Sequence, residues 1–180
     1  MLSSTTKPST KEPHIDFDTL SLNGSHYYVK RRSIVEKITF EHRTFYVKFE
    51  RIDETLTETV VSQHLNRQYT IAVALLDHGR INNLVLEYRG GKPARFYHTS
   101  KHLLHTLQIE DYQYYKGKKS NYLQLFIPVD ALSLTEADDM IQKISDELQM
   151  RLTKEWKCFP DKSLPECYNI ITLPYQKYKP

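Results

Sequence analysis

Two apolar segments separated by a short turn constrain the fold of this chain more than any other feature of its sequence. Residues 69–76 and 83–89 each carry the run of aliphatic side chains typical of a strand that is buried on both faces. Residues 77–80, Asp-His-Gly-Arg, have the composition of a turn. We therefore expect a β-sheet at the core, with these two segments as its central strands.

Three segments with helical periodicity are expected to pack on that sheet. Ser133 and Glu136 form a capping box that opens an apolar stripe. Pro93 opens a second helix, and a capping box at Thr55 opens a third, which ends near Asn66. The residues predicted to be buried in the core are Ile71, Val73, Leu84, Leu86, Leu125, Ile127, Ile141, Ile144 and Leu148.

The order of the segments predicts the fold class. Further strands are expected at 27–31, 34–40, 43–51, 111–116, 121–129 and 169–173, and the two longer helices near 94–107 and 133–154. Strands and helices in this order predict an α+β fold, in which helices flank a mixed β-sheet. Residues 1–13 are expected to be a disordered arm, and 14–180 a single domain with a strand-rich N-terminal unit (14–54) and a core (55–180).

The composition describes a folded protein with a mildly basic surface. Among 180 residues, 39% are apolar and 26% charged, and 25 Lys and Arg against 22 Asp and Glu give a net charge of +3. The longest apolar run, 71–76, is too short to span a membrane, and the first residues lack the apolar segment of a secretory signal. Two Cys suggest no disulfide framework, so a cytoplasmic location is expected.

Four blocks over roughly 55–176 resemble the primase–polymerase (prim-pol) domains of the archaeo-eukaryotic primase superfamily, and most closely the bacterial branch. Leu-Thr at 56–57, His-Leu at 64–65 and the strand at 69–76 are similar to the family's lead-in helix and strand. Leu-Val-Leu-Glu-Tyr-Arg-Gly (84–90) resembles the first catalytic motif, and Ser-Asn-Tyr-Leu-Gln-Leu-Phe-Ile (120–127) resembles the second. Phe-Pro at 159–160 and Asn-Ile-Ile-Thr-Leu-Pro-Tyr-Gln (169–176) resemble the last block. The resemblance implies a prim-pol/RRM-like sheet.

The same comparison argues against catalysis. Family members hold two divalent metals with two Asp on one strand, and the positions here carry Glu87 and Arg89. The His of the second motif is replaced by Tyr122, and no Asp follows the last block. A cation at the metal site opposes Mg²⁺ directly. We therefore expect no catalytic residue, no metal site and no cofactor, although a nucleoside triphosphate could bind.

A cluster of basic and aromatic residues predicts the binding site. Lys side chains beside Tyr rings suit a phosphate backbone with stacked bases, and Arg89 could bind phosphate oxygens in place of metals. The alternatives are a solvated hairpin tip for the lysines and a cross-strand ion pair at the end of the sheet for Glu87 and Arg89. The predicted nucleotide-binding or nucleic-acid-binding residues are Arg89, Lys116, Lys118, Lys119, Ser120, Tyr122 and Tyr115.

Other patterns are better explained by structure than by chemistry. These are the Asp16/Asp18 pair, the His98, His102 and His105 series, the Cys158/Cys167 pair and the basic segment 27–32. Two other functions remain open: an active nucleotidyltransferase with Glu87 as its surviving metal ligand, and a protein–protein interaction module. The sequence does not define an oligomeric state.

Overall fold

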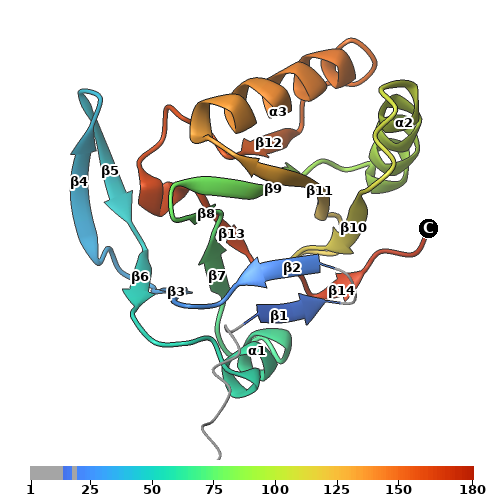
Figure 1. Cartoon of the computed structure of the whole chain (residues 1–180). Coiled ribbons are helices and arrows are strands. Elements are labelled where there is room, and N and C mark those ends of the chain that lie inside the picture. Colours follow the sequence, from blue (N-terminus) through green and yellow to red (C-terminus); the bar gives the residue numbers. More distant parts are fainter. Residues whose placement is uncertain (1–13, 18–19) are drawn as a thin grey trace, which may run out of the picture.

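The structure, a computed structural model, describes residues 14–17 and 20–180 (Figure 1). Its larger sheet has the strand order β12-β9-β11-β10-β14, with β8 paired to β9 beside β12. The strands of this sheet are β8 (Leu76–Asp77), β9 (Arg80–Tyr88), β10 (Gln113–Lys116), β11 (Leu123–Leu132), β12 (Trp156–Phe159) and β14 (Gln176–Lys177).

A second sheet of four strands has the order β13-β7-β3-β6. Its strands are β3 (Tyr27–Lys30), β6 (Phe49–Ile52), β7 (Ile71–Ala74) and β13 (Ile170–Thr172). Two further pairs complete the strands, β1 (His14–Phe17) with β2 (Leu20–Asn23), and β4 (Glu36–Phe40) with β5 (Arg43–Val47). The β4–β5 hairpin turns at Glu41 and His42, both with positive φ.

The α+β class is confirmed, but the single mixed sheet is not found. Every strand pairing among the described residues is antiparallel, and the two central apolar segments lie in different sheets. The chain leaves β7 at Leu75, and a tight turn at His78 and Gly79 folds β9 back onto β8. Because β8 takes the neighbouring position on β9, β7 pairs instead with β3 and β13.

Three α-helices are present in the described residues, as the sequence predicts, although the helix expected at 133–154 ends at Gln149. α2 (Pro93–Thr106) and α3 (Leu134–Gln149) lie over one face of the larger sheet, and α1 (Glu58–Leu65) lies beside β7 (Figure 1). A short 3₁₀ helix (Glu166–Tyr168) precedes β13. The capping box at Ser133 and Glu136 is present. The α1 cap is Thr57 rather than Thr55, because the Thr57 hydroxyl accepts the Val60 N–H at 3.3 Å.

One hydrophobic core joins both sheets and the two longer helices. All nine residues that the sequence predicts to be buried are buried. Aromatic rings tie α2 to the sheet: Phe96 stacks on Tyr88, with ring centroids 4.6 Å apart, and lies 6.1 Å from Trp156. The hydroxyls of Ser100 and Tyr114 share a hydrogen bond of 2.7 Å.

Two segments differ from their sequence interpretation. Residues 156–159 form β12 and residues 176–177 form the short strand β14, and neither segment was among the expected strands. The predicted arm, 1–13, lies outside the described residues. No helix in the described part of the chain is long and apolar enough to cross a membrane.

Candidate functional site

Glu87 and Arg89 lie at the end of β9, on one side of the strand. The Arg89 Nε donates a hydrogen bond of 2.7 Å to the Glu87 carboxylate, and its Nη2 contacts the same oxygen. The structure therefore contains an ion pair at the end of the sheet, but it joins two residues of one stretch of chain rather than two strands. The Glu87 side chain is 9% exposed, whereas that of Arg89 is 40% exposed and remains accessible to a ligand.

Tyr122 lies between two cations. The Arg89 Cζ is 5.6 Å from the centre of its ring, and the Lys119 Nζ is 5.4 Å from it. The loop that presents Lys119 is closed by two backbone hydrogen bonds, from Gly117 N–H to Tyr122 O and from Tyr122 N–H to Lys119 O, both 2.9 Å. Distances of this size allow cation–π attraction, which orients both cations.

Glycine is required at the start of this loop. A Cβ atom on Gly117 would lie 2.8 Å from the Tyr122 Cβ, closer than real Cβ contacts. The Tyr122 Cβ is fixed to the backbone and cannot rotate away. The close approach of the two residues therefore sets the position of the Tyr122 ring.

A second group of cations continues from the same loop. The Lys118 Nζ donates to the Thr70 hydroxyl at 3.0 Å, and the Arg67 Nη1 donates to the Lys118 carbonyl at 2.7 Å. The Arg67 Cζ lies 4.8 Å from the centre of the Tyr175 ring. We call the whole arrangement the basic strip. Its members are Arg67, Lys118, Lys119, Arg89, Tyr122 and Tyr175.

The buried side chain of His64 packs against Tyr175 at one end of the basic strip. Its ring stacks on Tyr175, with centroids 4.2 Å apart. The Ile71 N–H donates to His64 Nδ1 at 3.1 Å, so Nε2 carries the proton and donates to the Leu173 carbonyl at 2.8 Å. Burial lowers the pKa of His64 to about 4, and the charges of Lys118 and Arg67 also lower it. The ring is therefore neutral near pH 7.

The remaining predicted binding residues are placed differently. Tyr115 is buried, contacts Phe126 edge-on and donates to Gln113, so its ring belongs to the core and not to an open surface. Lys116 lies in β10 and, by strand alternation, shares the α2 side of the sheet with Tyr114. Ser120 is exposed beside Lys119. The basic strip thus includes Arg89, Lys118, Lys119 and Tyr122 of the predicted set.

Sequence reasoning missed Arg67 and Tyr175. Each lies far along the chain from the 116–122 loop. Tyr175 falls in the last block of the prim-pol resemblance, but no local pattern indicates that either residue belongs to a binding site. The hydrogen bond from Arg67 to the Lys118 carbonyl, which spans 51 positions, and the bond from the Tyr175 N–H to the Lys116 carbonyl bring them to the loop.

A cleft of about 560 Å³ lies beside Glu87 and Arg89. One wall is the whole of β12, and the opposite wall includes residues 46–49 and the β13 residues Ile170 and Thr172. Lysines 48, 154 and 157 also line it. The cleft therefore separates the edge of the larger sheet from the smaller sheet.

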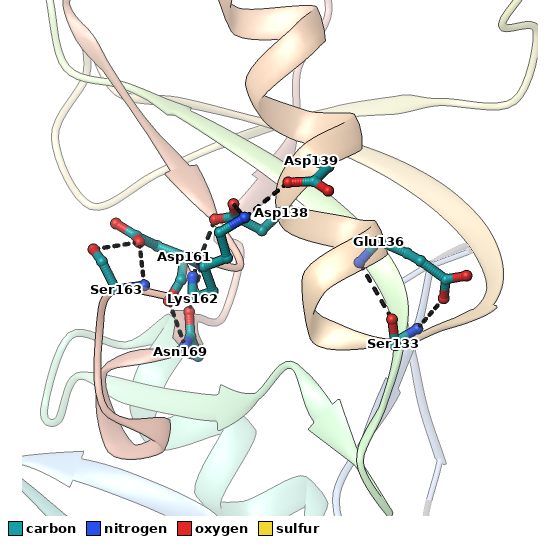
Figure 2. Close-up of polar contacts among 8 residues, drawn as sticks. All are labelled: Ser133, Glu136, Asp138, Asp139, Asp161, Lys162, Ser163 and Asn169. Atoms are coloured by element: carbon teal, nitrogen blue, oxygen red, sulfur yellow. Dashed lines mark hydrogen bonds and ion pairs between the residues drawn. The ribbon is translucent and has the colours of Figure 1, made fainter.

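The loop after β12 contributes Asp161 and Leu164 to the lining of the cleft, and polar contacts fix its position (Figure 2). The Asp161 carboxylate accepts the Ser163 N–H at 2.9 Å and the Ser163 hydroxyl at 2.6 Å. The Asn169 side chain accepts the Asp161 N–H and donates to the Asp161 carbonyl. The Lys162 N–H donates to the buried Asp138 of α3, and the Lys162 Nζ contacts Asp138 and Asp139.

The other sequence patterns do not form sites. Among the described residues, no three His, Cys, Asp or Glu side chains converge as metal ligands, and the three α2 histidines are exposed. Cys158 and Cys167 are free thiols that line the cleft, and burial raises the pKa of both. In the 27–32 segment both tyrosines are buried. Asp18 lies outside the described residues, and Asp16 lies in β1.

The fold and the basic strip define an α+β protein with antiparallel sheets and a cationic, ring-lined surface. A family model described as a domain of unknown function (DUF1882) matches residues 13–83, which is less than half of the chain. That part includes α1, β7, His64 and Arg67, and it ends within β9, before Arg89. No curated protein shows significant similarity to the chain.

Proposed function

We propose that this chain is a non-catalytic, prim-pol-like domain that binds nucleic acid or nucleotide along the basic strip, with single-stranded nucleic acid as the ligand that the strip fits best. The observation that supports this is the association of four cations with two aromatic rings, contributed by four separate parts of the sequence. Grooves that bind single strands combine positive charge along the backbone with rings near the bases.

The cations are suited to phosphate rather than to carboxylates of the protein itself. Among the described residues, Arg67, Lys118 and Lys119 form no ion pair, and they contact a carbonyl, a hydroxyl and aromatic rings. Only Arg89 is paired, with Glu87. These contacts orient the side chains without neutralising them, so a polyanion would meet a preformed row of charge.

The ion pair at the end of β9 supports the non-catalytic part of the proposal. A metal at this place would need the Glu87 oxygens as ligands, but the Arg89 guanidinium already contacts one of them and adds a positive charge there. That charge opposes a divalent cation and favours an anion. Binding should therefore proceed without Mg²⁺.

The test measures the binding of a fluorescein-labelled dT20 strand by anisotropy. Lys118→Ala with Lys119→Ala should weaken binding at least tenfold and should make the log–log salt slope shallower by about 1.4, because each lost phosphate contact removes about 0.7 for a single strand. The control is Lys143→Ala, an exposed lysine of α3, which should bind like the wild type.

A second variant tests Arg89. Because Arg89→Ala alone would leave the buried Glu87 carboxylate unpaired, the change is made together with Glu87→Gln. Combined with Lys119→Ala, it should abolish binding. Binding that survives both sets of changes, or that requires added Mg²⁺, would disprove the proposal.

A further inference from the structure

The outer edge of β12 has free backbone hydrogen-bonding groups. β12 is the last strand of the larger sheet, and its pairing partner is β9. The Arg89 N–H donates to the Glu155 carbonyl at 2.8 Å. Since alternate residues of an antiparallel strand bond to the same neighbour, this register directs the backbone of Lys157 to β9 and those of Trp156 and Cys158 outward.

Nothing in the described part of the chain satisfies these outward groups. No hydrogen bond involves the backbone N–H or C=O of Trp156 or Cys158 on their outer side. The Trp156 side chain is held on the α3 side, where its Nε1 donates to the Ser145 hydroxyl at 2.9 Å. The edge therefore offers two donors and two acceptors. All four residues of β12 line the cleft of about 560 Å³.

The charge of the cleft favours an acidic occupant. Lys48, Lys154 and Lys157 line it, and within the described residues none of the three forms an ion pair. Of its two acidic side chains, Glu87 is paired with Arg89, whereas Asp161 accepts hydrogen bonds only from the neutral Ser163 and keeps its charge. Three unpaired lysines against one unpaired carboxylate leave the cleft with a net positive charge.

The remaining lining suits alternating apolar side chains. It is supplied by both walls and includes Tyr46, Phe49, Phe159, Tyr168 and Ile170. The cleft thus combines an open strand edge with unpaired lysines and apolar side chains. These features suit an extended peptide, because main-chain hydrogen bonds give affinity and side-chain pockets give specificity. Open edges of this kind are otherwise blocked in native proteins.

We propose that the cleft binds an extended acidic peptide segment, which adds as a strand to the open edge of β12. The peptide backbone bonds to the outward N–H and C=O groups of Trp156 and Cys158. Its acidic side chains lie against Lys48, Lys154 and Lys157. The cleft shares Arg89 with the basic strip, but this inference does not rest on nucleic-acid binding there.

The probe is a fluorescein-labelled octapeptide, Glu-Val repeated four times, with Lys-Val repeated four times as its control. Two readouts follow binding: anisotropy, and the fluorescence of Trp156, the one tryptophan of the chain. The acidic peptide should bind and the basic one should not. Lys154→Glu with Lys157→Glu should weaken binding at least tenfold, whereas Lys101→Glu with Lys143→Glu, which changes exposed helix residues, should leave it unchanged.

Hydrogen exchange and N-methylation test the strand geometry. The amides of Trp156 and Cys158 should exchange at least tenfold more slowly in the complex, while the Lys157 amide, already paired with β9, should change little. N-methylation of the alternate peptide amides that face β12 should abolish binding. N-methylation of the other set, which points away from β12, should not. Lys118→Ala with Lys119→Ala should not affect the peptide, which separates this proposal from the previous one.

Three results would overturn the inference. The first is no binding of the acidic peptide at millimolar concentration. The second is binding that leaves the exchange of the Trp156 and Cys158 amides unchanged. The third is protection of the same two amides by dT20, which would assign the cleft to nucleic acid.

Discussion

Acidification should destabilise this protein through one buried side chain, His64. Its ring is buried with both nitrogens engaged, Nδ1 as acceptor for Ile71 and Nε2 as donor to Leu173. A second proton on the ring would place a donor against the Ile71 N–H and a charge beside Lys118 and Arg67. Protonation is therefore easier in the unfolded chain, where the histidine has its ordinary pKa.

The size of the effect follows from the two pKa values. His64 has a pKa of about 4 in the folded state against 6.5 in the unfolded chain. At about 1.4 kcal/mol per pKa unit, the full difference is worth about 3 kcal/mol. Because the folded pKa is the lower one, this stability is present above pH 6.5 and is lost as the pH falls toward 4. By pH 5 the loss is about 2 kcal/mol.

The assay is urea unfolding of the wild type and of His64→Gln at about pH 7.5 and pH 5. Other groups titrate in this range, including His26, whose pKa burial also lowers. The comparison between the two proteins removes their contribution. The variant should be less stable at pH 7.5, but its loss on acidification should be about 2 kcal/mol smaller than that of the wild type. His102→Gln, an exposed α2 position, is the matched control and should follow the wild type.

Two results would refute this reasoning. One is an equal loss of stability in the wild type and His64→Gln. The other is an NMR titration in which the His64 ring protons change with a midpoint near pH 6.5, as an exposed histidine does.

Three further outcomes are expected. Gly90→Ala should lower the free energy of unfolding in urea by about 1–3 kcal/mol, because a Cβ there meets the Tyr88 hydroxyl and the Glu155 carboxylate. Its neighbour Gly91 has open space, so Gly91→Ala should stay within about 0.5 kcal/mol of the wild type. Ser133→Ala should cost about 1 kcal/mol through loss of the α3 cap, and a wild-type melting temperature would contradict that role. With template, nucleotides and Mg²⁺ or Mn²⁺, the protein should not extend a primer, and extension that is lost in Glu87→Ala would establish the enzyme instead.

Local sequence patterns predicted the elements of this protein well. The capping box at Ser133 and the helical segments that became α2 and α3 are found where they were expected. These features depend on residues within one helix. Hydrogen bonds from side chain to backbone and the burial of one face are decided over such short distances, so the chain encodes them locally.

The candidate site could be predicted only where it is contiguous. The period of two along a strand placed Glu87 and Arg89 on one side, and the 116–122 loop brought Lys119 to Tyr122. The sequence did not predict Arg67 and Tyr175 as site residues, because they join the loop through contacts between distant segments. The position of Tyr115 in the core was likewise decided by the strands that pack against β10.

The sequence by itself determined the α+β class, the helices and the buried positions, since propensity and apolar periodicity are properties of short segments. The tertiary structure alone decided how most of the strands divide between two antiparallel sheets. It also decided that residues 156–159 form an open sheet edge and which basic side chains lie together in the basic strip. The physical reason is that a strand bonds to its neighbours through backbone groups that are the same in every residue. The choice of partner therefore depends on packing between distant segments, and local sequence does not record it.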